Sequence, residues 1–152
     1  MRTRLLLFGY GNPGRGDDAL GPLFIEQMSQ LNLPQVVCQN DMQLQIEHVT
    51  DLAECDQVLF IDADASCPEP FDFSMLTAEK DRSYTSHAVT PAALLHGYHQ
   101  VYGNHAPPAF LLRIRGYHFA LGDSLSVQAV INLAAAILPI RQMCVRGKLE
   151  NL

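Results

Sequence analysis

From Leu5 to Gly21 the chain reads LLLFGYGNPGRGDDALG, and this stretch decides the fold class. The apolar run LLLF closed by Gly9 is typical of a central strand buried on both faces, so we expect a strand over residues 3–9. After the loop, apolar residues recur at three- and four-residue spacing from Leu20 to Leu31, which predicts an amphipathic helix. A strand, a glycine-rich loop and a helix in this order indicate the start of an α/β unit.

The rest of the chain continues the alternation of strands and helices. Further strands are expected over residues 35–39, 58–61, 71–76 and 110–115. A ragged helical pattern covers residues 43–54, another helix starts at Thr90–Pro91, and a last one follows Ser126. The buried side of this last helix is predicted to carry Val127, Val130, Ile131, Ala134 and Leu138. The pattern predicts a single α/β domain over residues 1–152, with a mostly parallel twisted sheet and helices on both faces.

The composition favours a cytoplasmic protein without nucleic-acid or membrane partners. The formal net charge is -6, from 16 acidic and 10 basic side chains, so no basic field attracts a phosphate backbone or an anionic membrane. The first apolar run stops at Gly9, which is too short for a signal peptide or a membrane span. The four cysteines form no CxxC pair and are interpreted as free thiols.

The loop also raises the alternative of a nucleotide- or flavin-binding module, because Gly9, Gly11 and Gly14 spell GxGxxG. In that motif a pyrophosphate lies at the positive N-terminus of the next helix. Here Asp17 and Asp18 occupy that position and would repel a phosphate, and Pro13 lacks one N–H of the cradle. The charges therefore point to a cation site instead.

Two carboxylates and one imidazole fall where a metal site is expected. Asp18 follows the first strand, Asp62 ends the third, and His87 precedes a helix. Loops at the carboxyl ends of parallel strands converge on one crevice, so these side chains can meet there. Such a set would bind nickel, zinc or another first-row metal with positions open for substrate or water. Singly, each residue has a plainer role: Asp17 or Asp18 as a helix cap, Asp62 in a turn, and His87 as a surface histidine.

Four motifs in order carry a resemblance over nearly the whole chain: GYGNPGRGDDALGP, VLFIDAD, SHAVTPAALL and GDSLS. They resemble the hydrogenase maturation endopeptidases, which process the large subunit of nickel–iron hydrogenases. The resemblance implies that Asp18, Asp62 and His87 are the metal-binding and catalytic residues. It implies a supporting loop made of Gly9, Gly11, Asn12, Asp17 and Gly21.

The resemblance also implies a reaction, a metal-dependent cleavage that removes a C-terminal extension from the nickel-loaded large-subunit precursor. Nickel would be recognised in that substrate, and no other cofactor is expected. A noncatalytic nickel-binding maturation factor with the same site is a further alternative. Residues 40–44 look closer to members that serve cytoplasmic, cofactor-linked hydrogenases, and His118, in the loop before GDSLS, is a minor candidate for contact with substrate.

Overall fold

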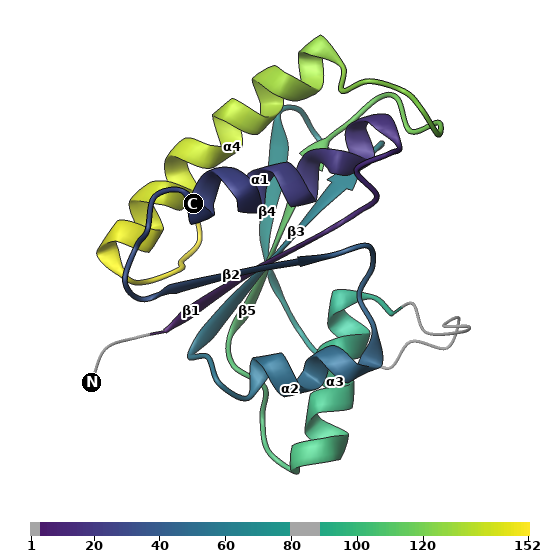
Figure 1. Ribbon diagram of the computed structural model, residues 1–152. Helices are drawn as coiled ribbons and strands as arrows, with labels where there is room; N and C mark the ends of the chain where they lie inside the picture. Colours follow the sequence, from purple (N-terminus) through teal and green to yellow (C-terminus); the bar gives the residue numbers. More distant parts are fainter. Residues whose placement is uncertain (1–3, 80–88) are drawn as a thin grey trace.

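The computed structural model describes residues 4–79 and 89–152 (Figure 1). The strands are β1 (Leu5–Tyr10), β2 (Val36–Asp41), β3 (Gln57–Asp64), β4 (Phe71–Leu76) and β5 (Ala109–Arg115). The helices are α1 (Leu20–Ser29), α2 (Val49–Leu52), α3 (Pro91–Tyr102) and α4 (Val127–Arg146), with short 3-10 turns η1 (Gly16–Ala19) and η2 (Ile46–His48).

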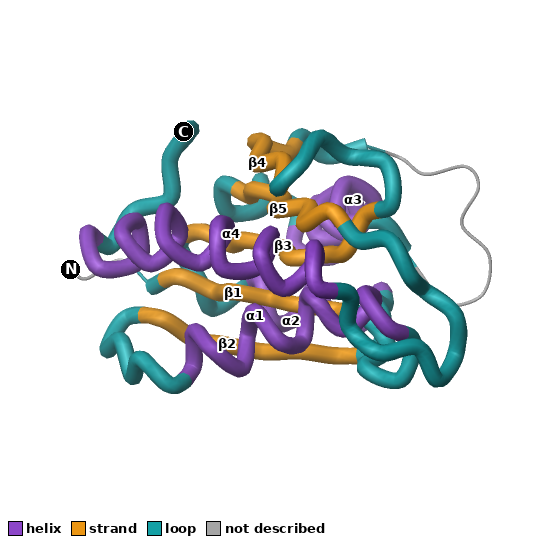
Figure 2. Tube along the Cα trace, turned by 90° about the horizontal axis from the view of Figure 1, so that it is seen from above, coloured by secondary structure: helices purple, strands orange, loops and turns teal. Residues whose placement is uncertain are grey.

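The strands form one five-stranded sheet in the order β2-β1-β3-β5-β4, which Figure 2 shows edge to edge. β1, β2, β3 and β5 run parallel, and β4 pairs antiparallel with β5 at the edge. After β1 the chain continues to β2 at one edge of the sheet, and after β3 it continues to β4 at the opposite edge. The two connections therefore diverge, and the carboxyl ends of β1 and β3 flank the crevice where α/β proteins bind ligands.

Helices cover both faces of the sheet, α1 and α4 on one face and α2 and α3 on the other (Figure 1). The first core joins α1 and α4 to alternate residues of the strands, such as Leu5, Leu7 and Ile61. The second joins α2 and α3 to the intervening residues, such as Leu6 and Phe60. The central strands are therefore buried on both faces, and the predicted α/β class with a mostly parallel sheet is confirmed.

The capping residues of the last two long helices are those that the sequence predicts. The Thr90 hydroxyl accepts a hydrogen bond from the Ala93 amide, with Pro91 at the first helical position. The Ser126 hydroxyl accepts from the Ala129 amide at 3.2 Å. The ragged segment 43–54 contains only η2 and α2, so its helical part is shorter than expected.

The prediction for the buried side of α4 is wrong. Val127, Val130, Ile131, Ala134 and Leu138 are exposed, whereas the buried face carries Ala129, Asn132, Leu133, Ala136, Ile140, Met143 and Cys144. Apolar residues lie almost all round this helix, so periodicity alone does not select the face that meets the sheet. Small alanines at positions 129 and 136 suit close packing against strands. By length and composition α4 also meets the requirement for a membrane span, a requirement that the core helix of a soluble protein can meet too.

Candidate active site

The candidate active site lies where β1 and β3 end side by side. Gly9 and Ile61 are partners in the parallel register, so the next residues, Tyr10 and Asp62, are neighbours at the carboxyl end of the sheet. The Tyr10 hydroxyl and the charge of Asp18, from η1, both act on the acidity of the Asp62 carboxyl group. The structure therefore brings together the two carboxylates that the sequence proposes as ligands.

The turn after β1 fixes the position of Asp18. Gly11 has a φ of 150°, and a Cβ there would overlap the carbonyl oxygen of Asp18. The amide of Asn12 donates to Asp18 Oδ2 at 2.6 Å, and Asn12 Oδ1 accepts from the Gly14 amide at 2.8 Å. Gly11 and Asn12 thus support Asp18 directly, while its carboxylate stays half-buried.

Asp17 has a different environment, because its side chain is 0% exposed. Asp17 Oδ2 accepts from the amides of Tyr117 and His118 at 2.7 and 3.1 Å and from the Ser126 hydroxyl at 2.8 Å. Asp17 Oδ1 accepts from the Ser126 amide at 2.7 Å. Burial opposes ionisation of Asp17, but these hydrogen bonds outweigh it and lower its pKa. Asp17 is therefore a structural clamp between η1 and the loop that leads into α4.

Gly9 and Gly21 bring α1 close to the sheet. A Cβ on Gly21 would lie 2.5 Å from the Tyr10 carbonyl oxygen and 2.9 Å from that of Ile61. A Cβ on Gly9 would lie 2.6 Å from the Gly21 carbonyl oxygen. These two glycines therefore serve close backbone packing of a helix on two strands, so their presence does not by itself indicate a bound phosphate.

Asp62 is the carboxyl group with the most perturbed acidity in the site. Burial first, and the negative charge of Asp18 second, raise its pKa to about 7, while the Ala63 amide and the Tyr10 hydroxyl oppose the shift. Nearby Asp64 contributes less, and its charge is compensated by Arg113 at 3.1 Å. Near pH 7 Asp62 is therefore about half protonated, and a cation bound beside it would favour its ionised form.

The third predicted ligand, His87, lies outside the described residues. Within residues 4–79 and 89–152 no group of three His, Cys, Asp or Glu side chains is arranged to hold a metal ion. The described part of the site therefore provides two carboxylates, and any third protein ligand has to come from elsewhere.

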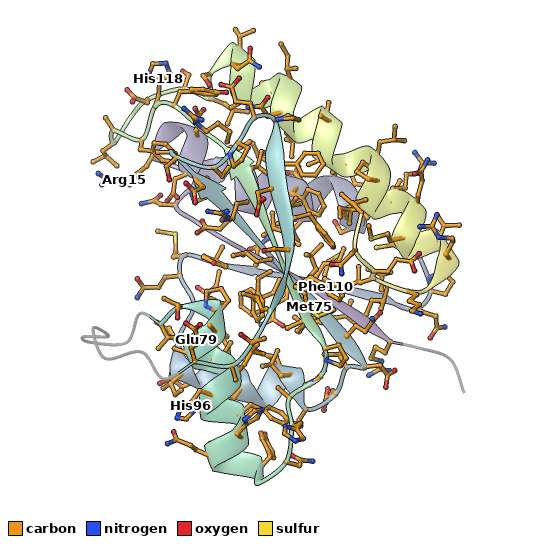
Figure 3. All side chains as sticks on the ribbon, turned by 180° about the vertical axis from the view of Figure 1, so that it is seen from behind. Arg15, Met75, Glu79, His96, Phe110 and His118 are labelled. Carbon is orange, nitrogen blue, oxygen red and sulfur yellow. The ribbon has the colours of Figure 1, made fainter. Side chains whose placement is uncertain are left out.

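His118 lies on the loop before α4, at the same end of the molecule as Arg15 (Figure 3). Its side chain is exposed, whereas its backbone is engaged in the Asp17 clamp, donating to the carboxylate and accepting from the Asp17 amide at 2.7 Å. The structure thus gives His118 a defined structural role through its main chain.

Two features of this edge are not predicted from the sequence. Tyr10 partners Asp62, although a tyrosine after a buried strand is an ordinary strand residue in sequence terms. Asp41, the register partner of Tyr10 at the end of β2, lies 3.2 Å from His48 Nε2. His48 is buried and its Nδ1 accepts from the Gln45 amide at 2.9 Å, so Nε2 carries the proton donated to Asp41. Asp41 was recognisable as another acid at a strand end.

Comparison with known proteins gives the fold its class. No family model and no curated protein matches the chain. Among solved structures, the matching fold is that of the nickel–iron hydrogenase maturation proteases, and the chain has this fold over nearly its full length.

The individual matches are distant in sequence. The maturation protease HycI of Thermococcus kodakarensis is 21% identical, with a TM-score of 0.73 over 95% of this chain and 94% of that one. The hydrogenase 2 maturation peptidase of a Thaumarchaeota archaeon is 22% identical, with a TM-score of 0.66 over 93% and 99%. The endopeptidase HybD of E. coli is 16% identical, with a TM-score of 0.68 over 95% and 94%. At these identities the likeness establishes the fold.

Proposed function

We propose that this protein is an endopeptidase that removes a C-terminal extension from the nickel-loaded large-subunit precursor of a nickel–iron hydrogenase. The observation that carries the proposal is the Asp18–Asp62 carboxylate pair at the carboxyl end of a sheet with the maturation-protease fold. The precursor is then the partner, the reaction is cytoplasmic, and neither nucleic acid nor membrane takes part.

The donor set suits the nickel ion of such a substrate. Carboxylate oxygens from Asp18 and Asp62, with an imidazole nitrogen from His87, are ligand types that nickel accepts, and they leave positions for ligands from the precursor. Binding a cation favours the ionised form of Asp62, whose pKa of about 7 reflects burial and the charge of Asp18. The two carboxylates repel each other in the free protein, whereas in the complex both would attract the bound cation.

Each neighbouring group then has a role in orienting this pair. The Tyr10 hydroxyl favours the ionised form of Asp62, and the Asn12 amide donates to Asp18 Oδ2 at 2.6 Å. A metal ion held here can polarise the scissile carbonyl or activate a water molecule. The orientations open to both carboxylates are limited by the protein before substrate arrives, which favours a fixed position for the ion.

The test is cleavage of a purified precursor, with and without nickel, followed by intact-mass spectrometry. We expect the wild type to shorten only the nickel-loaded precursor, and Asp18→Asn, Asp62→Asn and His87→Ala to leave it uncut. Asp56→Asn is the matched control, because Asp56 is an exposed aspartate at the amino end of β3, where its Oδ2 accepts from the Arg4 amide. Full processing by Asp62→Asn would refute the proposed site.

The same experiment separates the proposal from a noncatalytic nickel-binding factor. Such a factor would bind the nickel-loaded precursor without changing its mass. Binding without cleavage by the wild type, under conditions in which an authentic maturation protease cuts the same precursor, would therefore favour the alternative.

A further inference from the structure

The outer face of α4 carries an apolar stripe that no described element covers. Val127 is 80% exposed, Ile131 54%, Leu138 60% and Val145 66%, and the stripe is completed by exposed Ala134 and Arg141. The opposite face of α4 packs on the sheet (Figures 1 and 2). The spacing 4-3-4-3-4 of these six positions aligns them along one side of the helix, as in a helix that pairs with another helix.

The stripe is complementary to itself when a second copy runs antiparallel, because its spacing reads the same in both directions. With the two-fold axis level with Ala136, Val127 faces Val145 of the second copy. Ala134 then faces Leu138, so a small side chain meets a large one on both sides of the axis. Ile131 faces Arg141, whose aliphatic stem can cover it while the guanidinium reaches water.

The charges at the two ends of α4 fit the same arrangement. Asp123 is exposed just before the helix, and Lys148 is exposed just after it, whereas Arg146 already lies 3.7 Å from Glu150 of its own chain. Antiparallel pairing sets Asp123 of one copy near Lys148 of the other and opposes the two helix dipoles favourably. A parallel arrangement would instead place like charges side by side.

We propose that α4 is the interface of a two-fold symmetric dimer of this chain, with the two helices antiparallel. At roughly 100 Å² for each large apolar side chain, the stripe and its flanks bury about 1,000 Å² in the pair, the lower limit of specific interfaces. We therefore expect a weak dimer, with a dissociation constant on the order of 10 µM. This inference does not depend on the proposed enzymatic function.

A membrane surface is a less suitable occupant of the same stripe. The formal net charge of -6 opposes approach to an anionic bilayer, and Arg141 interrupts the stripe. An antiparallel second copy, by contrast, supplies a partner for every position of the stripe.

Sedimentation equilibrium from about 1 to 200 µM tests the dimer, with this concentration range chosen to bracket the expected affinity. We expect the mass to rise from 16.8 kDa toward twice that value. Leu138→Glu and Val145→Glu should each weaken association at least about tenfold, since each introduces a buried charge into the interface. Circular dichroism at each concentration verifies that both variants are folded.

A charge exchange across the axis makes the test specific. Val127→Lys combined with Val145→Glu should restore association, because the carboxylate introduced in each copy would face the ammonium group introduced in the other. Val101→Lys combined with Val145→Glu has the same net charge and should not restore it, because Val101 is an exposed residue of α3, on the other face of the sheet.

A mass that stays at 16.8 kDa at the highest concentration would overturn the proposal. So would equal restoration by both double variants, since that would reflect net charge rather than pairing across α4. Co-sedimentation of monomeric protein with phosphatidylglycerol vesicles, lost in Leu138→Glu, would assign the stripe to a membrane surface and likewise overturn the dimer.

Discussion

The two adjacent aspartates of η1 should respond in opposite ways to the same substitution. Asp17 is fully buried and accepts four hydrogen bonds, from the amides of Tyr117, His118 and Ser126 and from the Ser126 hydroxyl. Among the described residues Asp18 accepts one, from the Asn12 amide, and is repelled by Asp62. Replacing a carboxylate by an amide therefore removes stabilisation at position 17 and relieves repulsion at position 18.

The expected change in the free energy of unfolding follows from the number of these hydrogen bonds and from the charge of their acceptor. A hydrogen bond to a charged group contributes about 1.5–3 kcal/mol, and such contributions are not additive within one network. For Asp17→Ala, which leaves four hydrogen-bond donors without their buried acceptor, we expect a loss of about 4 kcal/mol in the free energy of unfolding. Asp17→Asn keeps one acceptor oxygen and should lose roughly 2–3 kcal/mol. Asp18→Asn should stay within about 0.5 kcal/mol of wild type or be slightly more stable.

Urea unfolding monitored by circular dichroism measures these differences, and thermal scans should show Asp17→Ala melting on the order of 10 °C lower. The pH dependence gives a second readout. Because the folded-state pKa of Asp17 is lowered, its stabilisation is present above the unfolded pKa of about 4 and is lost as pH falls through the lower folded value. The difference in unfolding free energy between wild type and Asp17→Asn should therefore become smaller in acid. A loss below about 1 kcal/mol for Asp17→Ala at neutral pH would refute the clamp.

Three further perturbations test the packing and electrostatics of the same edge. Gly21→Ala should destabilise by roughly 2–4 kcal/mol in urea unfolding, because its Cβ would lie 2.5 Å from a backbone oxygen. Gly97→Ala should cost much less, since the short contact of its Cβ, at 2.6 Å, is with the flexible Ile46 Cδ1, and equal losses would contradict this reasoning. Asn132→Leu should lose about 2 kcal/mol, because the buried amide donates to the Arg115 carbonyl and the Tyr117 hydroxyl; an unchanged unfolding midpoint would contradict it. Tyr10→Phe should move the Asp62 titration, followed by carboxyl NMR, above its wild-type pKa of about 7, because the hydroxyl that opposes the shift is gone; an unmoved midpoint would argue against this effect of Tyr10.

The strands could be predicted from local sequence, but their arrangement could not be read in full. Runs such as Leu5–Phe8 and Val58–Ile61 are apolar on both faces, and only a strand covered by helices on both sides satisfies them. The antiparallel placement of β4 beside β5 depends on pairing between residues such as Phe71 and Ile114, which no local pattern encodes. The buried face of α4 escaped prediction for a related reason, since both faces of that helix are apolar and only the docked sheet chooses between them.

In the candidate site, too, residues could be predicted where the local sequence defines their position, but not where their role depends on contacts with distant parts of the chain. Asp18 and Asp62 could be predicted because each is an acid at the end of a buried strand, and the topology brings such ends together. The separate role of Asp17 could not be predicted, because the donor residue Ser126 lies 109 positions away. The Tyr10 hydroxyl was missed because a tyrosine at a strand end is unremarkable until its neighbour across the sheet is known.

The Asp17 clamp fills a point near the GxGxxG loop where an anion could otherwise bind. The amides of Tyr117, His118 and Ser126 converge on one point near the start of α4, as donors do around a bound phosphate. That point is filled by the chain's own carboxylate, Asp17, so an external anion would have to displace it and leave it buried without donors. The three amides near the start of α4 are therefore satisfied within the chain, and Asp17, unlike Asp18, has its carboxylate fully engaged by the protein.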